Sequence, residues 1–139
     1  MDDELLAAFE GLTLPFDQWT HRAHVRVAYL YTSRSDSASA IERMRAGVKA
    51  YNAANQVPEA IDRGYHETTT VAFMRLIHAA VSIHGLAPSS EAFCDRHPEL
   101  LMKRVLLKFY TRGRIMSAEA KGTFIEPDLA PLPAGKEKE

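Results

Sequence analysis

The spacing of apolar residues along the chain predicts helices. Apolar positions recur every three or four residues, which is the period of a helix face packed on a core, and no segment shows the strict alternation of a half-buried strand. The segments that carry the helical pattern are residues 3–10, about 20–33, about 39–51, 65–83 and 89–96. We therefore predict an all-α protein, a single-domain irregular bundle of about five to six helices.

Small polar residues indicate where several of these helices begin. A side-chain oxygen just before a helix can accept a hydrogen bond from a backbone amide of the first turn, so serine is a favoured capping residue. Ser37 or Ser39 is suited to cap the third helix, and Ser89 or Ser90 is suited to cap the fifth. Ser117 is suited to cap a last short turn further along the chain.

The chain between these caps holds one more predicted helix and one long loop. Pro98 fits the first turn of a helix whose buried side would carry Leu101, Val105 and Phe109. Residues 52–64 form the longest irregular stretch. Loops of this length often border functional sites, so we expect this loop near any site that the fold contains.

The C-terminal residues predict an extended strap. Residues 124–133 contain too much proline for a helix and enough apolar residues to lie on the surface of the bundle. The last residues, 135–139, are glycine, lysine and glutamate and predict a disordered tail. The predicted domain therefore spans residues 1–134.

Composition and charge narrow the class of protein. With 139 residues, 46% apolar and 25% charged, the chain suits one soluble globular domain. The net charge of −1 gives no overall attraction to nucleic acid or to anionic lipid, and no apolar run is long enough to span a membrane. A single cysteine, Cys94, and the acidic residues after Met1 favour the cytoplasm. We expect neither nucleic acid nor a membrane as a partner.

Three histidines are the first candidates for chemistry. His21 and His24 lie three positions apart at the start of a predicted helix, so both rings project from one face and can reach one ion. His66 begins another predicted helix, and antiparallel packing could bring the three rings together. Three neutral imidazoles with an open position are typical of catalytic zinc, and two with a carboxylate are typical of non-haem iron. A divalent metal, zinc or iron, is therefore the expected cofactor.

The carboxylate next to His66 has two open roles. Glu67 could ligate the metal directly, or it could act as a general base toward metal-bound water. Adjacent residues on a helix point about 100° apart, so the role of base or supporting partner is favoured over direct ligation. The structural alternative is that His66 and Glu67 form a helix cap and Thr68 to Thr70 line its first turn.

Three further residues are candidates for substrate binding. Trp19 could wall a pocket, although a large aromatic residue before a helix is more often an anchor in the core. Arg104 and Tyr110 belong to a segment rich in basic and aromatic residues, which could hold a carboxylate or phosphate of the substrate. For the lysines of this segment the favoured alternative is a solvated helix face.

Several short motifs also carry a resemblance. The strings that resemble those of an uncharacterised family of small bacterial proteins are Trp19-Thr20-His21-x-x-His24, Gly64-Tyr65-His66-Glu67-Thr68-x-Thr70, Phe109-Tyr110 and Pro127-Asp128-Leu129-x-Pro131-Leu132-Pro133. The likeness covers most of residues 16–133. It implies no activity, cofactor or fold.

These residues together predict a small metal-dependent enzyme, a hydrolase or lyase that acts on a small polar molecule. The ion would lie on His21, His24 and His66, with Glu67 as the base. Two alternatives stay open: a metal-free module whose histidines line a pocket for a small acidic ligand, and a structural or interaction protein with histidines in a polar core. A homodimer is also left open.

Overall fold

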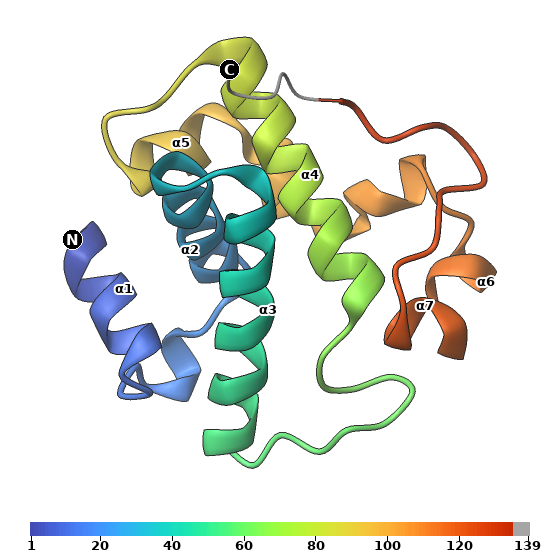
Figure 1. Cartoon of the computed structure of the whole chain (residues 1–139), viewed down its shortest axis with the longest axis horizontal. Coiled ribbons are helices and arrows are strands. Elements are labelled where there is room, and N and C mark those ends of the chain that lie inside the picture. Colours follow the sequence, from blue (N-terminus) through green and yellow to red (C-terminus); the bar gives the residue numbers. More distant parts are fainter. Residues whose placement is uncertain (135–139) are drawn as a thin grey trace.

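Five helices build most of the structure, a computed structural model that describes residues 1–134 (Figure 1). They are α1 (Asp2–Glu10), α2 (His21–Arg34), α3 (Ser37–Ala54), α4 (Glu67–His84) and α5 (Ser90–Arg96). The predicted all-α fold of a single domain is confirmed. The predicted tail at residues 135–139 lies outside the described residues.

Short helical segments connect and follow these five. They are η1 (Phe16–Gln18), η2 (Pro98–Leu101), η3 (Lys103–Lys108), α6 (Arg112–Ile115) and α7 (Ala118–Gly122). None of the helices within residues 1–134 is both long and apolar enough to cross a membrane.

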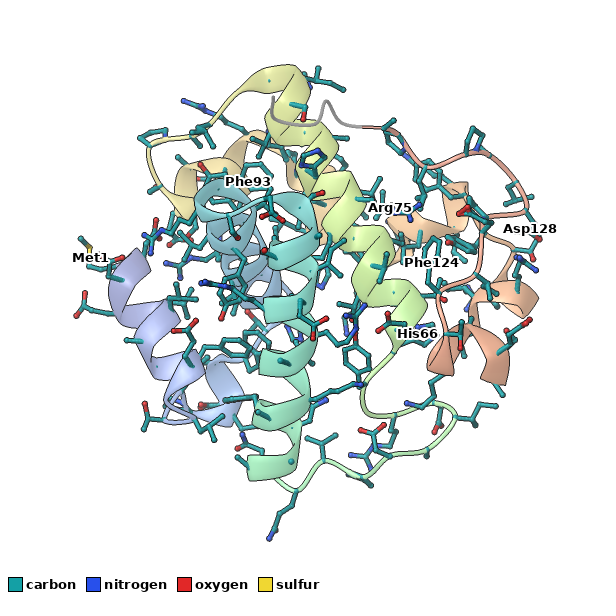
Figure 2. All side chains as sticks on the ribbon, viewed as in Figure 1. Met1, His66, Arg75, Phe93, Phe124 and Asp128 are labelled. Carbon is teal, nitrogen blue, oxygen red and sulfur yellow. The ribbon has the colours of Figure 1, made fainter. Side chains whose placement is uncertain are left out.

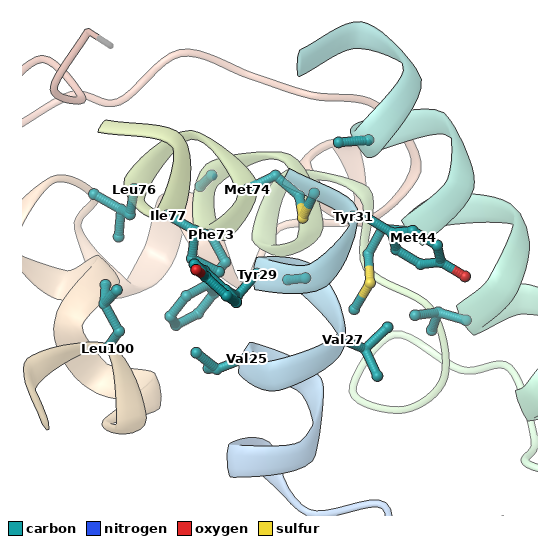
Figure 3. Close-up of a cluster of buried hydrophobic side chains, with 14 of the residues drawn as sticks. Val25, Val27, Tyr29, Tyr31, Met44, Phe73, Met74, Leu76, Ile77 and Leu100 are labelled. Atoms are coloured by element: carbon teal, nitrogen blue, oxygen red, sulfur yellow. The ribbon is translucent and has the colours of Figure 1, made fainter. Parts of the chain in front are cut away.

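Helix α2 lies at the centre of the fold and contacts α1, α3, α4 and α5 (Figure 1). Its residues from Val27 to Thr32 are all buried, so no side of this stretch is left for solvent. A helix that is apolar on every side is typical of the interior of a domain. Figure 3 shows the resulting core, in which side chains of α2 pack against Met44 of α3 and Phe73 of α4.

The helix starts show how well capping can be predicted from sequence. The Ser89 side chain caps α5 by accepting from the Ala92 amide, and Ser117 caps α7 in the same way. Both predictions are confirmed. The prediction that Ser37 or Ser39 caps α3 is wrong, because the Asp36 carboxylate accepts from the Ser39 amide. A carboxylate one position upstream competes successfully with the serines for the amides of the first turn.

The helix predicted after Pro98 is also wrong as a continuous element. Residues 98–108 form two separate 3₁₀ segments that meet at Met102, which has extended backbone geometry. Val105 is buried as predicted, whereas Leu101 and Phe109 are only partly buried.

The predicted strap follows α7 without any helix and is held by hydrogen bonds to the bundle. The buried Thr68 hydroxyl donates to the Thr123 carbonyl at 2.9 Å and accepts from the Ile125 amide at 3.2 Å. The Tyr110 hydroxyl donates to the Ile125 carbonyl at 2.7 Å. Phe124 lies under the Arg75 guanidinium, 4.4 Å from the ring centre (Figure 2).

A carboxylate near the start of the chain holds the start of α5. Asp2 accepts a hydrogen bond from the Ser90 amide at 2.9 Å and another from the Ser90 hydroxyl. Arg26 of α2 donates to both the Ser90 hydroxyl and the Asp2 carboxylate. This cluster ties α1, α2 and α5 together at one end of the bundle.

Candidate binding pocket

A pocket of about 630 Å³ opens between α2, α3 and α4 on one side and the short segments η3 and α6 on the other. Most of its wall is apolar and comes from the three long helices: Val25, Ala28, Met44, Val48, Phe73, Met74 and Ile77. The loop between α3 and α4 borders it through Val57, Gly64 and Tyr65. His21, His24 and His66 all line this one pocket.

His24 presents one free ring nitrogen to the pocket. Its other nitrogen, Nδ1, lies 2.8 Å from the Thr20 carbonyl oxygen, which can only accept, so Nδ1 carries the hydrogen. The ring stacks on the Trp19 indole at 3.8 Å between ring centres. Burial lowers the pKa of His24 to about 4, so the ring is neutral at pH 7 and Nε2 keeps a lone pair.

In His21 the roles of the two ring nitrogens are exchanged relative to His24. Its Nε2 donates to the Leu100 carbonyl at 2.9 Å, which leaves the lone pair on Nδ1. The ring meets the edge of Phe73 at 5.1 Å and lies 6.3 Å from the His24 ring. Burial lowers the pKa of His21, and the Lys103 cation acts in the same direction. His21 and His24 therefore give the pocket two neutral hydrogen-bond acceptors.

His66 uses both of its ring nitrogens within the protein. Nδ1 accepts from the Thr69 amide at 3.0 Å and so caps α4, while Nε2 donates to the Ile115 carbonyl at 2.9 Å. The cap interpretation therefore holds in part: His66 caps α4, whereas the Glu67 carboxylate accepts from the Arg45 and Tyr65 side chains instead. The ring, labelled at the start of α4 in Figure 2, has no lone pair left for an ion or a ligand in this arrangement.

The predicted metal site stays a prediction. Within residues 1–134 no three His, Cys, Asp or Glu side chains form a group that could hold a metal ion together. The nitrogens with free lone pairs at this place are Nδ1 of His21 and Nε2 of His24. For His66 to become a third ligand, its ring would have to release the Thr69 amide or the Ile115 carbonyl.

Glu67 lies in a different environment from the histidines. Its carboxylate accepts two hydrogen bonds from Arg45, at 2.6 and 3.0 Å, and one from the Tyr65 hydroxyl at 2.7 Å. The Arg45 guanidinium holds the pKa of this carboxyl below its usual range, and the Tyr65 hydroxyl adds to the effect. Glu67 is not among the residues that line the histidine pocket. As placed here, it supports Tyr65, which is part of the pocket wall.

The cations of the pocket lie on η3 and at the start of α6. Lys103, Arg104 and Arg112 line it, are exposed, and form no ion pair with any residue within 1–134. None of the described residues that line the pocket is an aspartate or a glutamate. The lining therefore has unpaired positive charge and no compensating negative charge.

The structure separates the three residues predicted to bind substrate. Trp19 and Arg104 line the pocket, whereas Tyr110 is fully buried beneath the strap and does not. Lys103 and Arg112 also line the pocket, but sequence reasoning singled out neither of them: a solvated face was favoured for the lysines, and Arg104 was the only arginine selected. Their place in the same basic segment as Arg104 was the available signal.

Comparisons with known proteins identify no relative from which a function could be inferred, so the proposal below rests on the geometry of the pocket. The chain matches no protein-family model, no curated protein and no solved structure.

Proposed function

We propose that the histidine pocket binds a small organic acid with an apolar body, and that it does so without a metal. The observation that carries this proposal is the charge of the lining: three unpaired cations, Lys103, Arg104 and Arg112, and no carboxylate. An anionic group at these cations gains attraction from all three and meets no like charge. The net charge of the whole chain, −1, gave no indication of this local excess of positive charge.

The remainder of the lining suits an apolar ligand body. Phe16, Trp19, Phe73 and Met116 offer aromatic and aliphatic surface, and covering the apolar body of a ligand with this surface would supply most of the affinity. A pocket of about 630 Å³ is within the range that small molecules occupy in proteins. The ligand class is therefore an alkyl or aryl carboxylate rather than a sugar or a free amino acid.

The proposal is tested with two ligands that differ only in charge. Trp19 is the only tryptophan of the chain and lines the pocket, so its fluorescence reports binding directly. We expect 3-phenylpropanoate to bind about three to ten times more tightly than 3-phenylpropanamide at pH 7, with the difference shrinking as salt is added. Equal affinity for the acid and the amide contradicts the proposal.

Charge variants show whether the cations of the pocket cause the preference. In the double variant Lys103→Gln, Arg104→Gln the preference for the acid should fall toward equality. Lys108→Gln is the matched control, because Lys108 is an exposed cation of the same segment that does not line the pocket. A control that loses the preference as fully as the double variant would point to general surface charge instead.

Metal-dependent hydrolase or lyase chemistry is a second candidate for the same pocket. It is favoured by the two free lone pairs, on His21 Nδ1 and His24 Nε2, whose rings lie 6.3 Å apart. Purification without a histidine tag followed by metal analysis tests it, with His24→Gln as the variant and His84→Gln, on an exposed histidine outside the pocket, as the control. Stoichiometric zinc or iron that disappears only in His24→Gln would support this candidate. The cytoplasm is the compartment that we propose for either function.

A further inference from the structure

We infer that the ligand of this pocket carries, besides its acid group, a neutral hydrogen-bond donor, a hydroxyl or an amide N–H, that binds Nε2 of His24. This inference rests on the proposed function and specifies the chemistry of its ligand. The acid group would lie at Lys103, Arg104 and Arg112, and the donor would lie deeper, against the imidazoles.

The hydrogen-bond partner of His24 fixes which of its nitrogens accepts. The Thr20 carbonyl receives two hydrogen bonds from His24, one from its backbone amide at 3.0 Å and one from Nδ1 at 2.8 Å. Thr20 is itself held in place as the cap of α2, where its hydroxyl accepts from the Ala23 amide. The tautomer with hydrogen on Nδ1 is therefore built into the start of the helix, and Nε2 remains an acceptor.

The fold supplies no donor for this acceptor. Within residues 1–134 Nε2 of His24 has no hydrogen-bond partner and is not completely buried, and His24 lines the pocket. Nδ1 of His21 is in the same position. In the unliganded protein water can donate to both nitrogens, and a ligand that displaces this water without replacing its hydrogen bonds loses affinity.

The charge around the histidines favours a neutral donor over an ammonium group. An ammonium ion could also donate to Nε2, but the lining offers it no carboxylate and places the Lys103 cation close enough to lower the pKa of both His21 and His24. A hydroxyl or an amide N–H donates without adding positive charge. The ligand is therefore a hydroxylated or amide-bearing acid rather than an amino acid with a free amine.

Matched ligands on the unchanged protein test this inference by calorimetry at pH 7. The first arm compares the 2-, 3- and 4-hydroxyphenyl derivatives of propanoate with their methoxy analogues, which accept but cannot donate. The second arm compares indole-3-propanoate with its 1-methyl derivative, which lacks the N–H. We expect at least one donor to bind about fivefold or more tightly than its blocked analogue.

Variants assign the preference to His24. In His24→Phe, which keeps an aromatic ring for Trp19 to stack on, the preference for the donor should disappear while the preference for the acid over its amide is retained. His84→Phe is the control and should keep both preferences. If His24→Phe does not fold, His24→Met removes the acceptor with a more flexible side chain, and the ligand comparisons on the unchanged protein still decide.

The outcomes separate this inference from the proposed function. If acids bind better than amides but every ligand with a donor binds with the same affinity as its blocked analogue, this inference is overturned and the proposed function stands. A donor preference that survives in the His24 variants also overturns the inference. If acids bind no better than amides, the proposed function fails and takes this inference with it.

Discussion

Acidification should destabilise the protein through His24, whose ring is neutral in the folded state. Its pKa is lowered from 6.5 to about 4, so the unfolded chain takes up a proton at a higher pH than the folded protein does. The free energy of unfolding is therefore unaffected above pH 6.5 and falls as the pH drops from there toward 4. Proton linkage gives a loss of about 2 kcal/mol at pH 5 and about 3 kcal/mol at pH 4 from this residue alone.

Urea unfolding followed by circular dichroism measures this loss, at pH 8 and at pH 5. Fluorescence is unsuitable here, because Trp19 stacks on the ring that is titrated. The free energy of unfolding of the wild type should fall by more than the contribution of His24, since burial also lowers the pKa of His21 and His66. His24→Gln cannot be protonated, so its own loss between the two pH values should be smaller by about 2 kcal/mol.

His84→Gln provides the matched control, since the same substitution is made at an exposed histidine outside the pocket. It should lose as much stability as the wild type between the two pH values. If His24→Gln also loses as much as the wild type, His24 is not held neutral by the fold, and the assignment of Nε2 as a free acceptor at neutral pH loses its support.

Three further substitutions test the parts of the fold that surround the pocket. Thr68→Val removes both hydrogen bonds to the strap and should lower the free energy of unfolding by about 1–3 kcal/mol in urea; wild-type stability would show that the strap is not held there. Gly64→Ala should lower the Tm, at a cost of about 1 kcal/mol or more, because φ is +86° and the new Cβ would overlap the Glu59 carboxylate; an unchanged Tm would contradict this backbone geometry. Glu67→Gln should cost about 1–3 kcal/mol by weakening the pairing with Arg45, yet leave the affinity for 3-phenylpropanoate within about twofold; a large loss of affinity at full stability would argue for a direct role in the pocket.

The helices could be predicted from sequence where one local signal dominates. Ser89 and Ser117 are caps as predicted, and neither has a carboxylate directly before it that could take its place. At α3 the carboxylate of Asp36 competes with the serines and wins. The segment after Pro98 has a helical spacing of apolar residues, but its helix is interrupted at Met102, where the backbone is extended. No local sequence pattern predicted this interruption.

The sequence predicted which histidines belong to the candidate site better than it predicted their hydrogen bonds. His21 and His24 lie three positions apart at the start of one predicted helix, and His66 begins another. This arrangement suggested one site, and all three histidines do line one pocket. Whether a ring nitrogen is free depends on carbonyls far away in the chain: Leu100 for His21 and Ile115 for His66. A sequence gives no register between such distant segments, so the shortage of free lone pairs at His66 could not be foreseen.

The contact between Asp2 and Ser90 has a consequence for how the protein is made. The two residues are 88 positions apart, so at about 5–20 residues per second a ribosome needs roughly 4 to 18 seconds to synthesise the stretch between them. The other end of α1 gains its partner much earlier, because Phe9 packs on Trp19 and Tyr51. Arg26 of α2 can also reach the Asp2 carboxylate early, because it is 24 positions away. Ser90 should therefore be the last partner that α1 acquires, and it completes the cluster only after α1 has docked on α2.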